Sequence, residues 1–62
     1  MNCILCLHVA GKIVPASAVM DGYSVCQHHQ QQIADQAHNI RFDSAGRFHL
    51  RATVEAMRKA QT

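Results

Sequence analysis

The stretch Val-Met-Asp-Gly-Tyr-Ser-Val-Cys-Gln-His-His, residues 19–29, decides how this chain is expected to fold. Its first part contains Asp21-Gly22, a pair that readily adopts the two positive φ angles of a type I′ turn. Valine stands on both sides of this turn, and β-branched residues favour strands. The stretch therefore predicts a tight β-hairpin with arms near 17–20 and 23–26.

A helical pattern begins where the hairpin ends, at Cys26. Residues 27–39 contain no glycine or proline, and they are rich in glutamine and alanine, which are adequate helix formers. The sequence predicts a helix over about 26–38, with Ser24 as its N-cap. Cys26 and His29 would then lie one helical turn apart on the same face.

The chain is short enough to need a chemical cross-link. At 62 residues it can form one small domain, and a core of that size rarely supplies more than about 3–5 kcal/mol. Its three cysteines are an odd number, whereas a disulfide framework needs an even one. No secretory signal is expected after Met1, so we expect a cytoplasmic protein with reduced thiols. A metal ion is therefore favoured over a disulfide.

The cysteines have the spacing of metal ligands. Cys3 and Cys6 form a CxxC pair, which fits a tight knuckle whose backbone amides donate to sulfur. Cys26 and His29 form a CxxH pair, and the hairpin would bring the two pairs together. The sequence predicts that these four residues bind one structural Zn²⁺ as a Cys₃His set.

The identity of the fourth ligand is less strongly determined than the three thiolates. His29 is favoured because it faces the same point as Cys26. His28, the neighbour that would point about 100° away on a helix, and His8, two residues after Cys6, are the alternatives. Three unrelated buried cysteines, an iron–sulfur cluster and a redox CxxC pair are the competing interpretations of the whole pattern.

The pattern CxxC followed by DGxxVCxxH resembles a treble-clef zinc finger over roughly residues 3–38. It is also similar to small zinc-finger proteins that phages and actinobacteria encode. One departure is Leu7, which stands where the second cysteine of a knuckle is usually followed by glycine. The resemblance implies an α+β fold and a zinc ion. It implies no particular activity, because treble clefs bind DNA, RNA or protein, or serve only as structural units.

The other segments give weaker signals. Residues 7–15 are expected to hold a short strand and a loop, because Gly11 and Pro15 interrupt them. Alternating apolar residues around an Asp-Ser-Ala-Gly turn predict a second hairpin over 40–50. Residues 51–61 predict a short amphipathic helix. We expect one domain, residues 1–62, made of a zinc-finger core, 1–39, and a basic hairpin-helix extension, 40–62.

Charge is distributed unevenly along the chain. Residues 1–40 carry one lysine against two aspartates, a net charge of −1, whereas residues 41–62 carry five basic residues against two acidic ones, a net charge of +3. A basic segment favours an anionic partner. We therefore predict binding to nucleic acid or a nucleoprotein complex through Arg41, Arg47, Arg51, Arg58 and Lys59.

A protein partner is the alternative prediction. Leu50, Val54 and Met57 form an apolar edge on the expected C-terminal helix, which would dock on another protein, on a second copy of the chain, or on the domain's own zinc-binding helix. In the first case the chain would be an adaptor or an inhibitor. A site with four protein ligands leaves no open position for a substrate, so we expect no enzyme activity. We expect neither a small-molecule substrate nor a membrane span.

Overall fold

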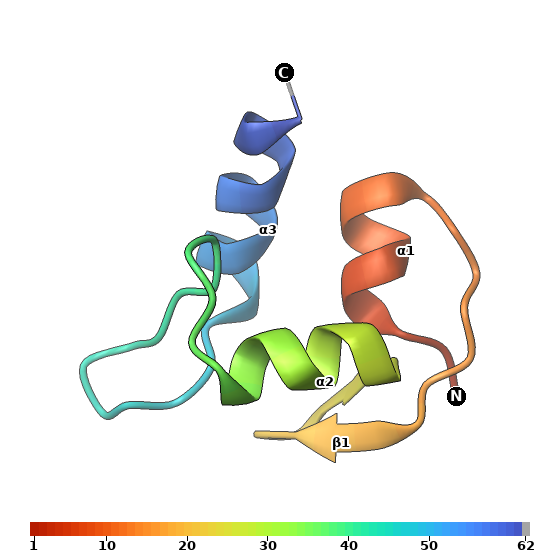
Figure 1. Cartoon of the computed structure of the whole chain (residues 1–62), viewed down its shortest axis with the longest axis horizontal. Coiled ribbons are helices and arrows are strands. Elements are labelled where there is room, and N and C mark those ends of the chain that lie inside the picture. The colour runs from red at the N-terminus through yellow and green to blue at the C-terminus, as the bar shows by residue number, and fades with distance from the viewer. Residues whose placement is uncertain (62) are drawn as a thin grey trace.

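The computed structural model describes residues 1–61 as three helices and one two-stranded antiparallel sheet (Figure 1). Helix α2 crosses in front of the hairpin, and helices α1 and α3 stand above it on opposite sides. The elements in chain order are α1 (Ile4–Ala10), β1 (Ala18–Met20), β2 (Tyr23–Val25), α2 (Gln27–Ala34) and α3 (Leu50–Ala60). The predicted α+β class is confirmed.

The first predicted hairpin is present. Asp21 and Gly22 occupy the turn with φ angles of 51° and 88°, which are the positive values that a type I′ turn needs. The strands pair Ala18 with Val25, Val19 with Ser24, and Met20 with Tyr23. The hairpin therefore ends at Cys26, directly before α2.

The prediction of a strand and loop over residues 7–15 is wrong for residues 7–10, because a helix begins directly after Cys3 and includes them; the loop follows, and Pro15 forms a single bridge to Asn2. The Sγ atom of Cys3 accepts a hydrogen bond from the Cys6 amide at 3.4 Å and so caps α1. No glycine or proline occurs before Gly11, which ends the helix with a φ angle of 66°. The expected knuckle at residues 3–6 is thus the first turn of α1.

The segment after α1 returns to the start of the chain. The Cys3 amide donates to the Val14 carbonyl at 2.7 Å, and the Ala16 amide donates to the Met1 carbonyl at 2.9 Å. These bonds hold the segment before β1 against the segment before α1. They bring Cys3 close to the hairpin that leads to Cys26.

Helix α2 is shorter than the predicted 26–38, and its N-cap is Cys26 rather than Ser24. The helix ends because Gln36 adopts a φ angle of 52°. Its amide bonds the Ile33 carbonyl, and the Ala37 amide bonds the Gln32 carbonyl. This is a Schellman motif with glutamine in the place where glycine is common.

The second predicted hairpin, over 40–50, is reduced to a single bridge between Phe42 and Phe48. The Asp43 carboxylate accepts hydrogen bonds from the amides of Ala45 and Arg47, both at 2.9 Å, which forms a compact turn. The Phe48 amide donates instead to the Asp21 carboxylate at 2.8 Å. In this segment, carboxylate side chains accept hydrogen bonds from backbone amides that would otherwise pair two strands. No regular strands form.

Helix α3 confirms the predicted C-terminal helix, and it packs mainly against α1 rather than against the helix that follows Cys26. The Arg58 Nε atom donates to the His8 carbonyl at 3.0 Å, near the C-terminal end of α1. A cationic side chain at that end also suits the helix dipole. The apolar edge of α3 thus has an intramolecular partner.

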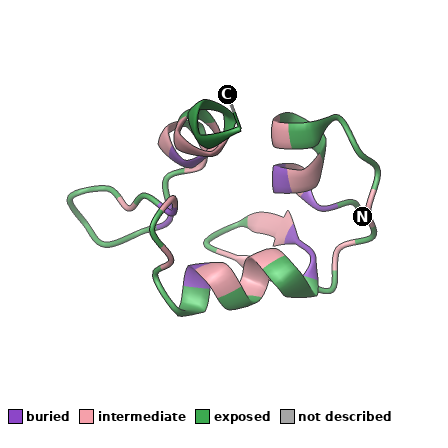
Figure 2. Ribbon diagram, turned by 45° about the horizontal axis from the view of Figure 1, so that its top comes forward, coloured by how far each residue is buried: buried purple, intermediate pink, exposed green. Residues whose placement is uncertain are grey.

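The buried residues form one cluster at the junction of the hairpin and the helices (Figure 2). Two of them, Cys3 and Cys26, are candidate metal ligands, so the predicted site lies within the core. The cluster consists of Cys3, Leu5, Val25, Cys26, Ile33, Ile40 and Phe48.

No helix within residues 1–61 has the length and apolar character needed to cross a lipid bilayer.

A buried hydroxyl connects α3 to the segment after α2, and its removal is the first test of this fold. Thr53 is fully buried, and its Oγ1 atom accepts from the Arg41 amide at 2.9 Å and donates to the Arg41 carbonyl. Thr53→Val should lower the free energy of unfolding by about 1–3 kcal/mol, because it leaves these groups without their partner. Urea denaturation of the metal-loaded protein measures this change. The control is Ser17→Ala, which removes an exposed hydroxyl; equal effects of the two substitutions would contradict the proposed role of Thr53.

Candidate metal centre

Four potential ligands meet at one point in the structure. Cys3, Cys6, Cys26 and His29 each offer one ligand atom, and these atoms all lie within 4.8 Å of one another. They come from the start of α1 and the start of α2, which the hairpin brings together. The predicted grouping of these residues is therefore present as a set that could hold a metal ion.

The distances have a common pattern. The Nδ1 atom of His29 lies 3.3 Å from the Cys3 sulfur, 3.5 Å from the Cys6 sulfur and 3.4 Å from the Cys26 sulfur. The sulfurs of Cys6 and Cys26 are 3.9 Å apart. A disulfide requires about 2.0 Å, so the cysteines are free thiols. A single imidazole nitrogen faces three sulfurs, as in a mononuclear centre.

The structure selects His29 from the candidate histidines. His28 is exposed, and its ring lies edge-on to that of His29 with the ring centroids 5.2 Å apart. His8 is also exposed, on the side of α1 that faces α3. Neither alternative contributes to the group of four.

The first turns of two helices explain the ligand spacing. Cys3 is the N-cap of α1 and Cys26 is the N-cap of α2. Cys6 and His29 each follow their N-cap by three residues, which returns the side chain to the same face. Helix N-termini also favour negative charge, so both capping thiolates lie in a favourable field.

Burial and neighbouring groups change the pKa values of three candidate ligands. Burial, together with neighbouring thiols, raises the pKa of Cys6 to about 12. Burial opposes ionisation of Cys3 too, but the Cys6 amide and other hydrogen bonds hold the pKa of Cys3 below its usual value. Burial and the neighbouring His28 lower the pKa of His29, which keeps the imidazole neutral and able to bind metal. Ionisation of the Cys6 thiol is therefore favoured only when a cation lies beside it.

The residues predicted to bind a partner lie outside this centre. Arg41 Nη1 donates to the carbonyls of His38 and Ile40, and Arg58 is held by His8 as described. Arg51 forms an exposed ion pair with Glu55, with 3.6 Å between Nε and Oε1. Arg47 lies exposed in the turn after Asp43, and Lys59 is exposed on α3. Several of these cations thus have intramolecular contacts.

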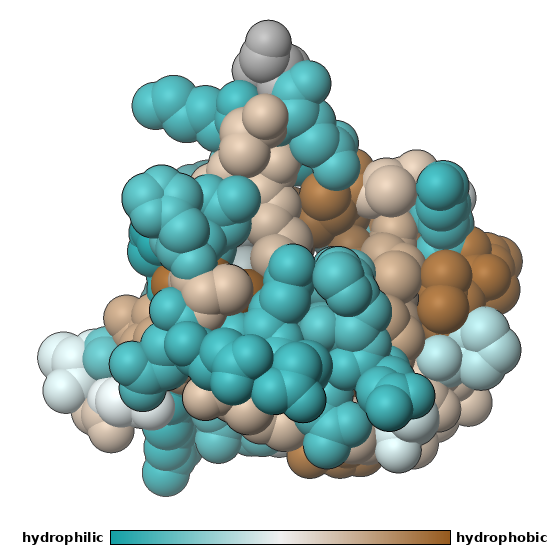
Figure 3. Space-filling view, viewed as in Figure 1, coloured by the Kyte–Doolittle hydropathy of each residue, from teal (hydrophilic) through white to brown (hydrophobic). Residues whose placement is uncertain are grey.

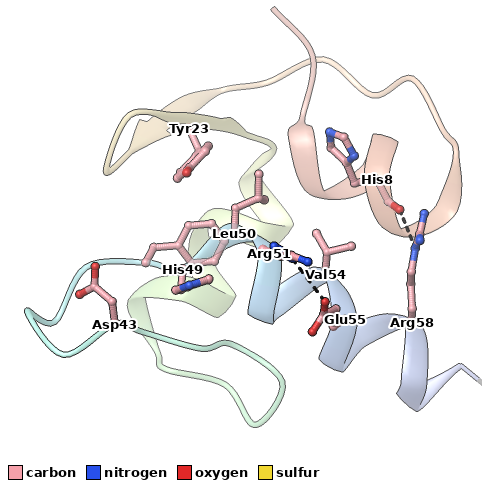
Figure 4. A pocket seen from close by; sticks show the side chains of 10 residues that line it. His8, Tyr23, Asp43, His49, Leu50, Arg51, Val54, Glu55 and Arg58 are labelled. Carbon is pink, nitrogen blue, oxygen red and sulfur yellow. Dashed lines mark hydrogen bonds and ion pairs between the residues drawn. The ribbon is translucent and has the colours of Figure 1, made fainter.

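A groove of about 520 Å³ lies between α1, the hairpin and α3 (Figure 4). Tyr23, Leu50 and Val54 provide apolar surface, and the Tyr23 ring stands edge-on to the buried Phe48 ring at a centroid distance of 5.7 Å. Arg58 crosses from α3 to α1 at one end. The groove arises from the packing of α3 on α1, for which the sequence has no local pattern. Phe48 is buried, so its ring is not available to stack on a nucleic-acid base.

The chain was compared with protein-family models, curated proteins and solved structures. No match was found in any of the three comparisons. The geometry of the site and the surface therefore provide the basis for a functional proposal.

Metal binding should strengthen as the pH rises. The raised pKa of Cys6 means that this thiol holds its proton at neutral pH until a cation displaces it. Each proton released per metal increases the affinity about tenfold per pH unit, so release from Cys6 alone predicts a loss of at least about 100-fold as the pH decreases from about 8 to about 6. Competition with a chelator of known pH dependence measures this slope. An affinity that does not change over this range would contradict the proton-release account.

Proposed function

We propose that the chain is a non-catalytic binding module folded around one structural Zn²⁺. The observation that carries this proposal is the group formed by Cys3, Cys6, Cys26 and His29. In a tetrahedron with Zn–S distances of about 2.3 Å and a Zn–N distance of about 2.0–2.1 Å, two sulfurs are about 3.8 Å apart and sulfur and nitrogen about 3.5 Å apart. The observed separations of 3.9 Å and 3.3–3.5 Å agree with that geometry.

The chemistry of the ligands also favours zinc. Three thiolates and one imidazole are soft or borderline ligands, and Cys₃His is a common structural zinc set. Cys3 has no solvent exposure and Cys26 is buried, so the ligands form part of the core. Four protein ligands complete a tetrahedron and leave no position for substrate or water, which supports a structural role.

The arrangement of elements supports the treble-clef resemblance. The hairpin β1–β2 leads directly into α2, whose N-cap and first turn supply Cys26 and His29. The first ligand pair differs from a short knuckle because Cys6 lies within helix α1. The proposed module is therefore treble-clef-like in its second ligand pair and helical in its first.

Zinc analysis is the direct test of this part of the proposal. Purified protein should contain about one zinc per chain, and Cys26→Ser should lose both the metal and the cooperative unfolding transition. The reason is that structural zinc contributes about 10–16 kcal/mol of apparent binding free energy in zinc-finger peptides. Ser17→Ala serves as the control, because Ser17 is exposed and lies outside the group of ligands. A variant that keeps its fold without zinc would contradict the structural role.

Nucleic acid is the first candidate partner. The basic residues gather in the part of the chain after the zinc centre, with a net charge of +3 over 41–62. The exposed surface of α2, at the front of Figure 3, is hydrophilic but consists of glutamine and histidine. The basic residues of this segment therefore lie outside the metal-binding helix, and Arg47 and Arg51 are two of the exposed ones.

A protein partner is the second candidate, and the groove is the observation that favours it. Its apolar walls, Leu50 and Val54, lie beside Tyr23, whose ring combines an apolar face with a polar hydroxyl. Two arginines, Arg51 and Arg58, and two carboxylates, Asp43 and Glu55, also line the groove. This combination suits an apolar side chain flanked by charged groups, as an adaptor or inhibitor surface would bind.

Salt dependence distinguishes the two partners. Binding to duplex DNA through n phosphate contacts should weaken with a log–log slope near −0.9n, and Arg47→Gln with Arg51→Gln should reduce that slope by about two contacts. Fluorescence anisotropy with labelled single-stranded and duplex oligonucleotides measures it. Glu55→Gln is the matched control, since it removes a negative charge from the same helix and should not weaken binding.

Binding that does not weaken with salt would instead identify the protein-binding function. Affinity purification from cells should then recover a partner that survives about 0.5 M salt, because buried apolar contacts are little screened. Val54→Asp should abolish the recovery, whereas Ala60→Asp, at the exposed end of the same helix, should not. Absence of oligonucleotide binding together with this result would contradict the nucleic-acid candidate.

A further inference from the structure

One buried polar atom has no hydrogen-bond partner. Over residues 1–61, the Oε1 atom of Gln32 is the only buried side-chain nitrogen or oxygen without one. The amide nitrogen of the same side chain lies 3.4 Å from Nε2 of His28. A buried acceptor left unpaired costs about 1–3 kcal/mol, so a donor for Gln32 Oε1 is expected in the functional state.

The ring of His29 supplies such a donor once a metal is bound. The Nδ1 atom faces the three sulfurs at 3.3–3.5 Å and is the ligand atom of the group. A neutral imidazole that binds metal through Nδ1 carries its proton on Nε2. Metal-bound histidines usually donate this proton to an oxygen acceptor, which orients the ring and strengthens the ligand.

The position of Gln32 fits this role. Gln32 follows His29 by three residues on α2, so the two side chains lie on the same face of the helix. Both line a hollow of about 390 Å³ between the end of α2 and the end of α3, which Ile40 and Met57 close on the apolar side. The acceptor and the imidazole thus share one partly enclosed space.

We propose that Gln32 is a positioning residue for the metal centre, whose Oε1 accepts a hydrogen bond from Nε2–H of His29 when the metal is bound. This inference rests on the metal site proposed above. It gives a role to a polar atom that is buried and has no hydrogen-bond partner. Because Gln32 Oε1 has no partner in the structure, completing the bond requires a rotation of the Gln32 amide or a bridging water.

The test is a metal-affinity series on the full chain. Gln32→Met should reduce Zn²⁺ affinity about tenfold or more, the usual effect of losing a partner of a metal-bound histidine. Gln32→Glu keeps an oxygen acceptor at the same place and should retain most of the affinity. Gln30→Met, on the same helix but outside the hollow, is the matched control.

A spectroscopic measurement separates positioning from general stability. In zinc-loaded wild-type protein, the ¹⁵N-bound Hε2 proton of His29 should exchange slowly with solvent, and Gln32→Met should make it exchange rapidly. Equal affinities of Gln32→Met and Gln30→Met, or a rapidly exchanging Hε2 proton in the wild-type protein, would overturn the proposal. Failure of the wild-type protein to bind zinc would instead overturn the metal site itself.

Discussion

Three thiols and one imidazole converge on a single point inside this small protein, and the rest of the structure depends on how their charges are balanced. Burial disfavours ionisation of the Cys6 thiol, whereas binding to a metal requires thiolates. A cation bound by these four residues would resolve this conflict and would join the first turns of α1 and α2. Two of its ligands, Cys3 and Cys26, belong to the same buried cluster as Leu5 and Val25. The metal centre and the hydrophobic core are therefore one unit.

This unit also determines the surface of the molecule. Helix α1 is held at one end by the metal centre through Cys3 and Cys6, and α3 packs along it. The bond from Arg58 to His8 and the bond from Phe48 to Asp21 fix the extension on the core at two further points. The groove lies between elements that these contacts hold together. A binding function of the extension would consequently depend on the metal, although no basic residue touches it.

Much of the fold and the ligand set could be predicted from local patterns. Asp21-Gly22 has few alternatives to a type I′ turn, and the CxxC and CxxH spacings match one helical turn each. Helix α1 is not predicted because Gly11 and Pro15 interrupt residues 7–15, whereas the helix is confined to the run before Gly11 and is capped by the Cys3 sulfur. The end of α2 was missed because Gln36 takes a left-handed conformation that its residue type does not announce. Tertiary contacts, such as the packing of α3 on α1, have no signal in a single sequence.

X-ray absorption at the zinc edge, on protein purified without added metal, tests the central claim most directly. The account predicts three sulfur neighbours at about 2.3 Å and one nitrogen neighbour at about 2.0–2.1 Å around each zinc. A coordination shell made only of nitrogen and oxygen, or protein that carries no metal and contains a disulfide between two of its cysteines, would contradict it.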